Sequence, residues 1–150
     1  MKRRQTTPAQ WLIVNRLPDA KLRTAARHLP PGNGVLVLHR LMPGDRRWLR
    51  HVAAQRGLIV FDDSRLALRV HNQRELTAAL LRRPLLVLVS PIHRTRSHPD
   101  WRPLPRMRAA TLARLANRRA IALGGMDEQR FRRVQRLGFV GWAGISAFRI

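Results

Sequence analysis

The stretch PLLVLV, at residues 84–89, is the clearest apolar run in the chain, and it decides the expected fold. An unbroken run of this length is typical of a strand that is buried on both faces, as in a parallel sheet. A long polar loop follows at residues 90–105, then an amphipathic helical pattern at residues 106–117 and another apolar run at residues 120–123. This alternation predicts an α/β protein in which helices cover a parallel sheet.

The alternation extends towards both ends of the chain. Further strands are expected at residues 10–14, 34–38, 58–61 and 139–143, and further helices at residues 19–28, through Trp48 and Ala53, through Glu75 and Leu80, and at residues 126–137. Residues 64–70 are too few for both a helix and a strand, so the pattern is compressed there. The repeating strand–helix unit, in a chain of 150 residues, predicts a single domain over residues 1–150.

Composition excludes several classes of site. The chain has no cysteine, which rules out disulfides, thiolate zinc sites and cysteine nucleophiles. No apolar run approaches the roughly 18–20 residues of a membrane span. The first residues, MKRRQTTP, do not lead into the apolar core of a signal peptide. A cytoplasmic location without membrane association is therefore expected.

The charge balance points to phosphorylated partners. Thirty Lys and Arg against eight Asp and Glu give a formal net charge of +22, which attracts polyanions. Only two of these cations are lysine, and this arginine bias is explained as well by the base composition of the genome as by selection for phosphate contacts. Non-specific binding of nucleic acid needs no motif and stays open, although the chain has no zinc-finger spacing and no Tyr.

The ends of the last two expected strands carry an anion-site pattern. Gly124 and Gly125 end one strand, and Gly144, Ile145 and Ser146 follow the next. Glycines let a backbone approach a ligand closely and expose amide groups, and closed strand–helix barrels often bind phosphate at the loops after their last two strands. Glycines at such junctions also serve turn geometry alone, and this alternative stays open.

Three runs resemble the C-terminal half of the thiamine-phosphate synthase family, which includes TenI-like members. They are SPIHRTRSHP at residues 90–99, ALGGM at residues 122–126 and GWAGISA at residues 141–147, in the family's order and spacing. The resemblance implies a TIM-barrel-like (β/α) fold, shortened by about two units because 150 residues are fewer than the about 200 that a full barrel needs. It implies that aminopyrimidine diphosphate is joined to thiazole phosphate, with Mg²⁺ assisting the release of pyrophosphate.

The resemblance also assigns roles to residues. Thiazole phosphate would be held by Gly124, Gly125, Gly144, Ile145 and Ser146, the diphosphate by Thr95, Ser97 and His98, and the metal by Asp62. The chain departs from the family pattern at Phe61, which replaces an asparagine, and at His98, which replaces a diphosphate-binding lysine. The family's fourth strand, with its second acidic metal ligand, is absent. Asp62 and Asp63 are therefore open to interpretation as a solvated loop pair.

Other functions remain open at this point. A thiazole tautomerase of the same fold would use His71 or His98 as its base, because imidazole titrates near neutral pH. A histidine at a strand end that bonds to the backbone, or one on a basic surface, has no such role. A non-catalytic protein that binds phosphorylated ligands and a basic nucleic-acid-binding module are the remaining alternatives. Missing units would also leave strand edges uncovered, which predicts a homodimer.

Overall fold

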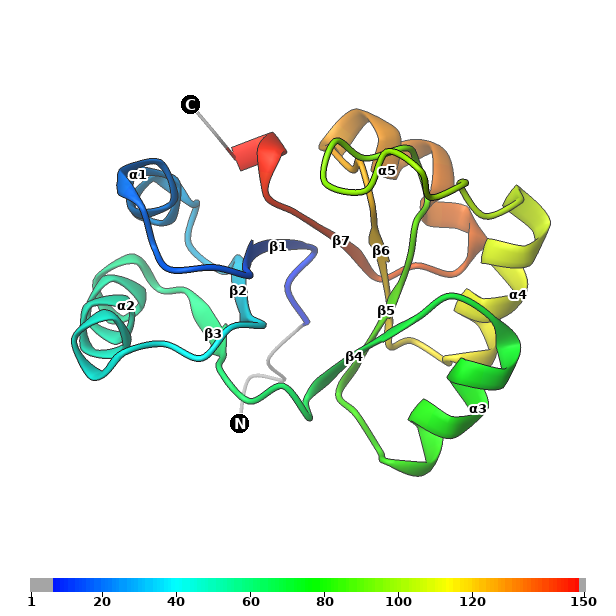
Figure 1. Ribbon diagram of the computed structural model, residues 1–150, viewed down its shortest axis with the longest axis horizontal. Helices are drawn as coiled ribbons and strands as arrows, with labels where there is room; N and C mark the ends of the chain where they lie inside the picture. The colour runs from blue at the N-terminus through cyan, green and yellow to red at the C-terminus, as the bar shows by residue number, and fades with distance from the viewer. Residues whose placement is uncertain (1–6, 149–150) are drawn as a thin grey trace, which may run out of the picture.

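One curled parallel sheet forms the centre of the molecule in the computed structural model, which describes residues 7–148 (Figure 1). Within these residues the sheet has seven strands, in the order β3-β2-β1-β7-β6-β5-β4. The elements in chain order are β1 (Gln10–Val14), α1 (Ala20–His28), β2 (Gly34–Val37), α2 (Pro43–Arg56), β3 (Ile59–Phe61), β4 (Ala67–Val70), α3 (Gln73–Leu81), β5 (Leu86–Val89), α4 (Arg106–Leu115), β6 (Ala120–Leu123), α5 (Glu128–Val134), the 3₁₀ turn η1 (Gln135–Leu137), β7 (Gly141–Gly144) and the 3₁₀ turn η2 (Ser146–Phe148). The expected fold class is confirmed.

The strand order is that of a barrel with one interruption. The first strand pairs in parallel with the last, with Trp11 opposite Ala143, as it also does with β2. The interruption lies between β3 and β4, which occupy the two ends of the strand order although they follow each other in the chain. The compressed segment holds β4 alone, without a helix before it. Counted in strands, the described sheet is one short of eight, a smaller deficit than the two units expected.

Polar caps fix the starts of three helices. Asp19, Asn72 and Asp127 each accept a hydrogen bond at 2.8 Å from the backbone amide three residues later, which satisfies a donor that the first helical turn leaves free. Gly57 ends α2 in the left-handed conformation, with a φ of 65°, which a glycine adopts without steric cost. No helix among residues 7–148 is long and apolar enough to cross a membrane.

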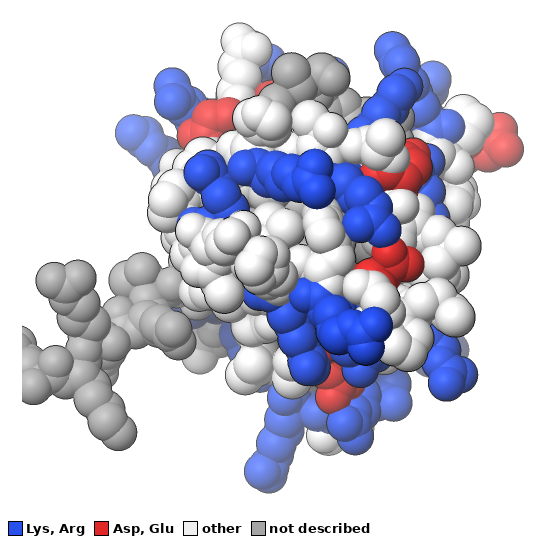
Figure 2. Space-filling model, turned by 90° about the vertical axis from the view of Figure 1, so that its left-hand side faces the viewer, with Lys and Arg blue, Asp and Glu red and all other residues white. Residues whose placement is uncertain are grey.

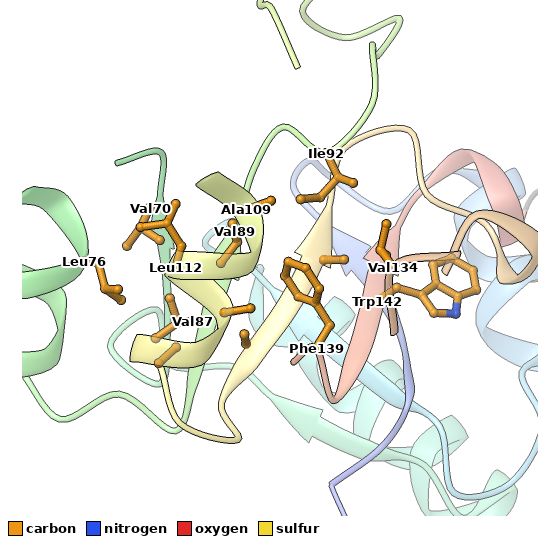
Figure 3. Close-up of a cluster of buried hydrophobic side chains, with 14 of the residues drawn as sticks. Val70, Leu76, Val87, Val89, Ile92, Ala109, Leu112, Val134, Phe139 and Trp142 are labelled. Atoms are coloured by element: carbon orange, nitrogen blue, oxygen red, sulfur yellow. The ribbon is translucent and has the colours of Figure 1, made fainter. Parts of the chain in front are cut away.

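The core has two sides. On the convex side, β4–β7 pack on α3, α4 and α5 through one apolar cluster, drawn in Figure 3, while β1–β3 pack on α1 and α2 through a second. The third cluster contains no helix residue, so it fills the concave side of the sheet. This concave cluster consists of Trp11, Ile13, Leu36, Ala67, Leu86, Leu88, Ile121, Leu123 and Ala143.

Trp11 is the largest side chain of the concave cluster and is fully buried. Its indole nitrogen donates a hydrogen bond to the Pro8 carbonyl at 2.8 Å. Its ring packs against the Phe61 ring, with the two ring centroids 4.9 Å apart. A Cβ on Gly34 would lie 2.1 Å from the Trp11 ring, so the ring needs a glycine on the neighbouring strand. These aromatic rings fill the concave side near the interruption between β3 and β4.

Candidate functional site

A cavity of about 580 Å³ opens at the carboxyl ends of the strands, where α/β sheets bind ligands. Its wall takes residues from β1, β4, β6 and β7, from the loop after β5 and from the start of α5. Seven residues with expected phosphate or diphosphate roles line it: Thr95, Ser97, His98, Gly124, Gly125, Gly144 and Ile145. The side chain of Ser146, which the resemblance also assigns to phosphate, lies outside what the structure describes.

Gly124 and Gly125 bring the β5 loop close to the end of β6. Both have positive φ angles, of 105° and 58°. A Cβ on Gly124 would lie 2.9 Å from the Pro91 Cα, and one on Gly125 would lie 2.5 Å from the Arg94 carbonyl oxygen. The His93 amide donates to the Gly124 carbonyl at 3.0 Å, which ties the loop to this junction. Turn geometry and close packing therefore account for both glycines, with or without a ligand.

The backbone around these glycines also offers amide donors to the cavity. Among the described residues, no backbone carbonyl accepts a hydrogen bond from the Gly125 or Ile145 amide. Both residues lie on the cavity wall, at the ends of two neighbouring strands. Gly144 lies beside them, and a Cβ there would meet nothing closer than the Met126 carbonyl oxygen at 3.4 Å. Amides arranged in this way suit an anionic group.

Among the described residues, four arginines line the cavity, and the resemblance assigned a role to none of them. Arg69 lies on β4, Arg94 and Arg96 lie in the loop after β5, and Arg130 lies on α5. The one carboxylate on the described wall is that of Asp127, which caps α5 and lies 3.8 Å from the Arg130 guanidinium. Although Arg69 is exposed to solvent, nearby protein atoms desolvate its guanidinium and lower its pKa. The cavity is therefore strongly positive.

His98 and His71 both contact the Trp101 ring. The His98 ring stacks on the indole, with centroids 4.1 Å apart and planes 10° apart, and His98 lines the cavity. The His71 ring meets the indole edge-on at 5.3 Å and is not on the cavity wall. Its Nδ1 lies 2.9 Å from a carboxylate oxygen of Glu75. His98 is therefore the better placed of the two for contact with a ligand, and His71 contacts the site through Trp101.

Asp62 lies away from the cavity, at the end of β3. Its carboxylate is 3.6 Å from Arg50. The Asp63 carboxylate is bound by Arg65 at 2.7 Å, and this hydrogen bond lowers the Asp63 pKa to about 2. Among residues 7–148, no three Asp, Glu, His or Cys side chains come together as metal ligands. Because each carboxylate already has an arginine partner, these side chains do not fit the Mg²⁺ site that the resemblance implies.

The missed residues carried only a weak signal in the sequence. Arg69 follows Ala67 by two positions in a strand, so it shares the concave side of the sheet, where a charge is unusual. That position could have been found from the alternation of the strand. Arg130 and Trp101 carried no such signal, because they reach the cavity from a helix surface and from an irregular loop.

Two solved structures share this architecture. A thiamine phosphate pyrophosphorylase from Pyrococcus furiosus matches with a TM-score of 0.72 and 14% identity, covering 95% of this chain and 88% of the other. A thiamine phosphate pyrophosphorylase from Bacteroides thetaiotaomicron matches with a TM-score of 0.56 and 14% identity, covering 93% and 83%. At this identity the likeness shows the fold.

The sequence comparisons give the family. A search of curated proteins found no match. The family model described as thiamine monophosphate synthase, TMP-TENI, matches residues 51–148, which is more than half of the chain. That range includes β4–β7, the loop after β5 and nearly all of the cavity wall. The chain therefore belongs to the thiamine monophosphate synthase family.

Proposed function

We propose that this protein is a thiamine-phosphate-synthase-like enzyme that joins aminopyrimidine diphosphate to thiazole phosphate and releases pyrophosphate. The observation that carries the proposal is the cavity, because it gathers seven residues expected to contact the two substrates. Its volume of about 580 Å³ is within the usual range of about 300–1,000 Å³ for small-molecule sites. Family membership supports the same chemistry.

The two substrates would occupy different parts of the cavity. The amides of Gly125 and Ile145 suit the phosphate of thiazole phosphate, at the ends of β6 and β7. The diphosphate would lie against the loop after β5, near Thr95 and His98. The Thr95 hydroxyl accepts a hydrogen bond from the His98 amide at 3.0 Å, which orders this part of the loop.

Charge complementarity supports the release of pyrophosphate. The bond between the aminopyrimidine carbon and the diphosphate oxygen breaks, and its electron pair leaves with the pyrophosphate while the new bond to the thiazole forms. The negative charge of the leaving group grows in this step, and fixed positive groups stabilise such growing charge. Arg94 and Arg96 lie in the loop beside the expected diphosphate position.

A second candidate is thiazole tautomerisation, with His98 as the base. It is favoured by the poor fit of Asp62 to a metal site, since this reaction needs neither a diphosphate nor a metal. A protein that binds phosphorylated ligands without catalysis would need only the cavity. The synthase, the tautomerase and the non-catalytic protein would all bind thiazole phosphate. They would differ in the reaction that follows binding.

Calorimetric titration with thiazole phosphate tests the shared step. We expect binding by the wild-type protein and about tenfold weaker binding by Gly144→Ala, equal to about 1.4 kcal/mol, because the added methyl group narrows the cavity wall. Gly44→Ala is the matched control, since a Cβ there meets no atom within 4 Å. Absence of binding, or equal affinity for all three proteins, would contradict the proposed site.

Turnover then separates the three functions. The synthase should form thiamine phosphate and pyrophosphate from both substrates, and the tautomerase should convert the thiazole phosphate tautomer alone, with loss of activity in His98→Gln. A protein that binds thiazole phosphate but performs neither reaction is the non-catalytic alternative. Detection of thiamine phosphate is the result that supports the proposal stated first.

Nucleic-acid binding and homodimerisation stay predictions. Figure 2 shows the side that carries α1 and α2, with Lys and Arg side chains spread around it and few Asp and Glu between them. Such a surface supports non-specific contacts with a polyanion, whose affinity should fall steeply as salt rises. The outer edges of β3 and β4 pair with no other strand in the described sheet, which supports association of two chains.

A further inference from the structure

The arginines of the cavity point to a way of binding diphosphate that does not use a metal. We propose that Arg69, Arg94 and Arg96 bind the diphosphate group of the substrate directly, without a divalent cation. The inference rests on the proposed function, because it concerns the same cavity. It departs from the Mg²⁺ dependence that the resemblance implies.

The first support is the arrangement of charge. The three arginines come from two elements, β4 and the loop after β5, and all line one cavity. Guanidinium groups match phosphate oxygens in pairs of hydrogen bonds, so several of them around one cavity suit a diphosphate better than a monophosphate. The cavity also disfavours a free divalent cation, because like charges repel.

The second support is the lack of protein partners for these charges. Within the described residues, Arg69, Arg94 and Arg96 form no ion pair with a carboxylate. Arg130 differs, because it lies 3.8 Å from Asp127 and also donates to the Gly125 carbonyl. Desolvation lowers the pKa of Arg69, so a bound anion would compensate a charge that no carboxylate of residues 7–148 pairs with.

The third support is the state of the candidate metal ligands. Asp62 and Asp63 lie off the cavity wall, where Arg50 is 3.6 Å from the Asp62 carboxylate and Arg65 binds the Asp63 carboxylate at 2.7 Å. A cation at Asp62 would have to compete with Arg50 and would still lack a second nearby carboxylate that is free. The positive charge that a diphosphate requires is present instead on the arginines of the wall.

Calorimetric titration of the full chain with inorganic pyrophosphate tests this proposal. At about 150 mM salt, which weakens non-specific contacts, we expect pyrophosphate to bind in the presence of EDTA. Inorganic phosphate should bind at least about tenfold more weakly, because it offers fewer oxygens to the arginines. Replacing EDTA by excess Mg²⁺ should leave the affinity unchanged or weaken it. Pyrophosphate binding that appears only with Mg²⁺ would overturn the proposal.

Arginine variants locate the site. Arg96→Gln, in a loop, and Arg69→Gln, in a strand, should each weaken pyrophosphate binding at least about tenfold, since each loses charge-assisted hydrogen bonds. Arg47→Gln on the exposed surface of α2 removes the same charge and should bind as the wild type does. If Arg69→Gln unfolds, Arg96→Gln alone tests whether the arginines of the cavity wall bind pyrophosphate. Equal weakening by all three substitutions would mean non-specific attraction and would overturn the proposal.

Thiazole phosphate separates this inference from the proposed function. If pyrophosphate requires Mg²⁺ while thiazole phosphate binds and is sensitive to Gly144→Ala, only the metal-free diphosphate site is wrong. If thiazole phosphate fails to bind at all, the proposed function is wrong as well.

Discussion

The two regions on either side of the sheet interruption share one construction and differ in their loops. Residues 7–61, the N-terminal region, and residues 67–148, the C-terminal region, each pack strands against helices through a convex cluster of their own. The N-terminal region contributes only Ile13 and Asn15 to the described cavity wall, and the C-terminal region contributes the rest. Both regions therefore build the sheet and its helical cover, whereas the C-terminal region builds nearly all of the cavity wall.

Loop length explains the difference. Only five residues connect β1 with α1, and five connect β2 with α2, whereas residues 90–105 connect β5 with α4. These short connections have few residues that could line a cavity at the carboxyl ends of the strands. The long loop carries five of the wall's arginine or hydroxyl side chains, and close packing against Gly124 and Gly125 holds it near the end of β6. Binding chemistry is expected where a rigid sheet presents such a loop.

The largest expected effect tests the N-terminal region as a structural support. Trp11→Ala should lower the free energy of unfolding by about 3–5 kcal/mol, because it leaves a large void in the concave cluster. Urea denaturation measures this loss. The folded fraction should still bind thiazole phosphate, since Trp11 is not on the cavity wall.

Trp101→Ala is the matched change in the C-terminal region. Trp101 is 39% exposed and stacks on His98 at the cavity, so its removal should cost much less stability and should weaken ligand binding. The contrast between the regions fails if Trp101→Ala destabilises the protein as much as Trp11→Ala does.

A smaller effect compares two glycines with positive φ angles. Gly32, in the N-terminal region, has a φ of 85° and no atom within 4 Å of an added Cβ, whereas a Cβ on Gly125 would lie 2.5 Å from the Arg94 carbonyl oxygen. Gly32→Ala should cost about 1–2 kcal/mol from backbone strain alone. Gly125→Ala should cost more and should also weaken thiazole phosphate binding, because the β5 loop has to move.

Chemical denaturation and calorimetric titration measure the two glycine variants. Equal stability losses, with ligand binding unchanged in both, would show that the β5 loop adapts freely to a side chain at position 125. The conformational demand at Gly125 would then be the turn alone.

Most of the fold was predictable from the sequence because each buried strand is a short continuous apolar run. The run at residues 84–89 contains β5, and Asp19, Asn72 and Gly57 mark helix ends through capping chemistry that acts locally. The size of the shortening was harder to predict. Residues 64–70 looked like a gap, yet Ala67 and Arg69 have the alternation of one more strand, which pairs with β5.

The site was predictable only where residues follow strands. Gly125 and Ile145 lie at strand ends, and parallel strands bring such positions to one edge. The approach of Trp101 to His98 and the charge of Arg130 depend on the course of a long loop and the position of a helix, which no local pattern encodes. Asp62 shows the reverse case, since it directly follows β3 and yet is not on the cavity wall.

A pair of helix caps gives a third comparison. Asp19→Ala and Asp127→Ala each remove a side-chain acceptor from a helix start, which should cost about 1 kcal/mol in either region. Only Asp127 lines the cavity, where its negative charge opposes an anion. Asp127→Ala should therefore bind phosphate ligands more tightly, and Asp19→Ala should bind them as the wild type does. Thermal melts and calorimetric titration measure the two effects, and weaker phosphate binding by Asp127→Ala would contradict the expected sign.

The smallest effect is a pH dependence confined to the C-terminal region. Burial is the main cause that lowers the pKa of His93, and Arg130 and Arg133 lower it further while Asp127 opposes them. In the described structure the buried His93 Nε2 has no hydrogen-bond partner. The folded state therefore favours the neutral ring. Its contribution to stability is present above the ordinary pKa of about 6.5 and is lost as the pH falls through the lower pKa of the folded state.

Thermal melts of the wild type and of His93→Gln between about pH 7.5 and pH 5 check this sign, because the ordinary pKa of about 6.5 lies within that range. The wild type should lose more stability than the variant on acidification, since only its ring has to become charged in a partly buried position beside Arg130. His28→Gln, at an exposed position on α1, controls for the removal of one histidine.

Hydrogen exchange locates the acid-sensitive part of the molecule. The His93 side chain packs close to Gly125, and the His93 amide donates to the Gly124 carbonyl, so protonation of His93 should first increase hydrogen exchange in the loop after β5. Faster exchange that begins instead in β1 or β2 would place the acid-sensitive part of the molecule in the N-terminal region.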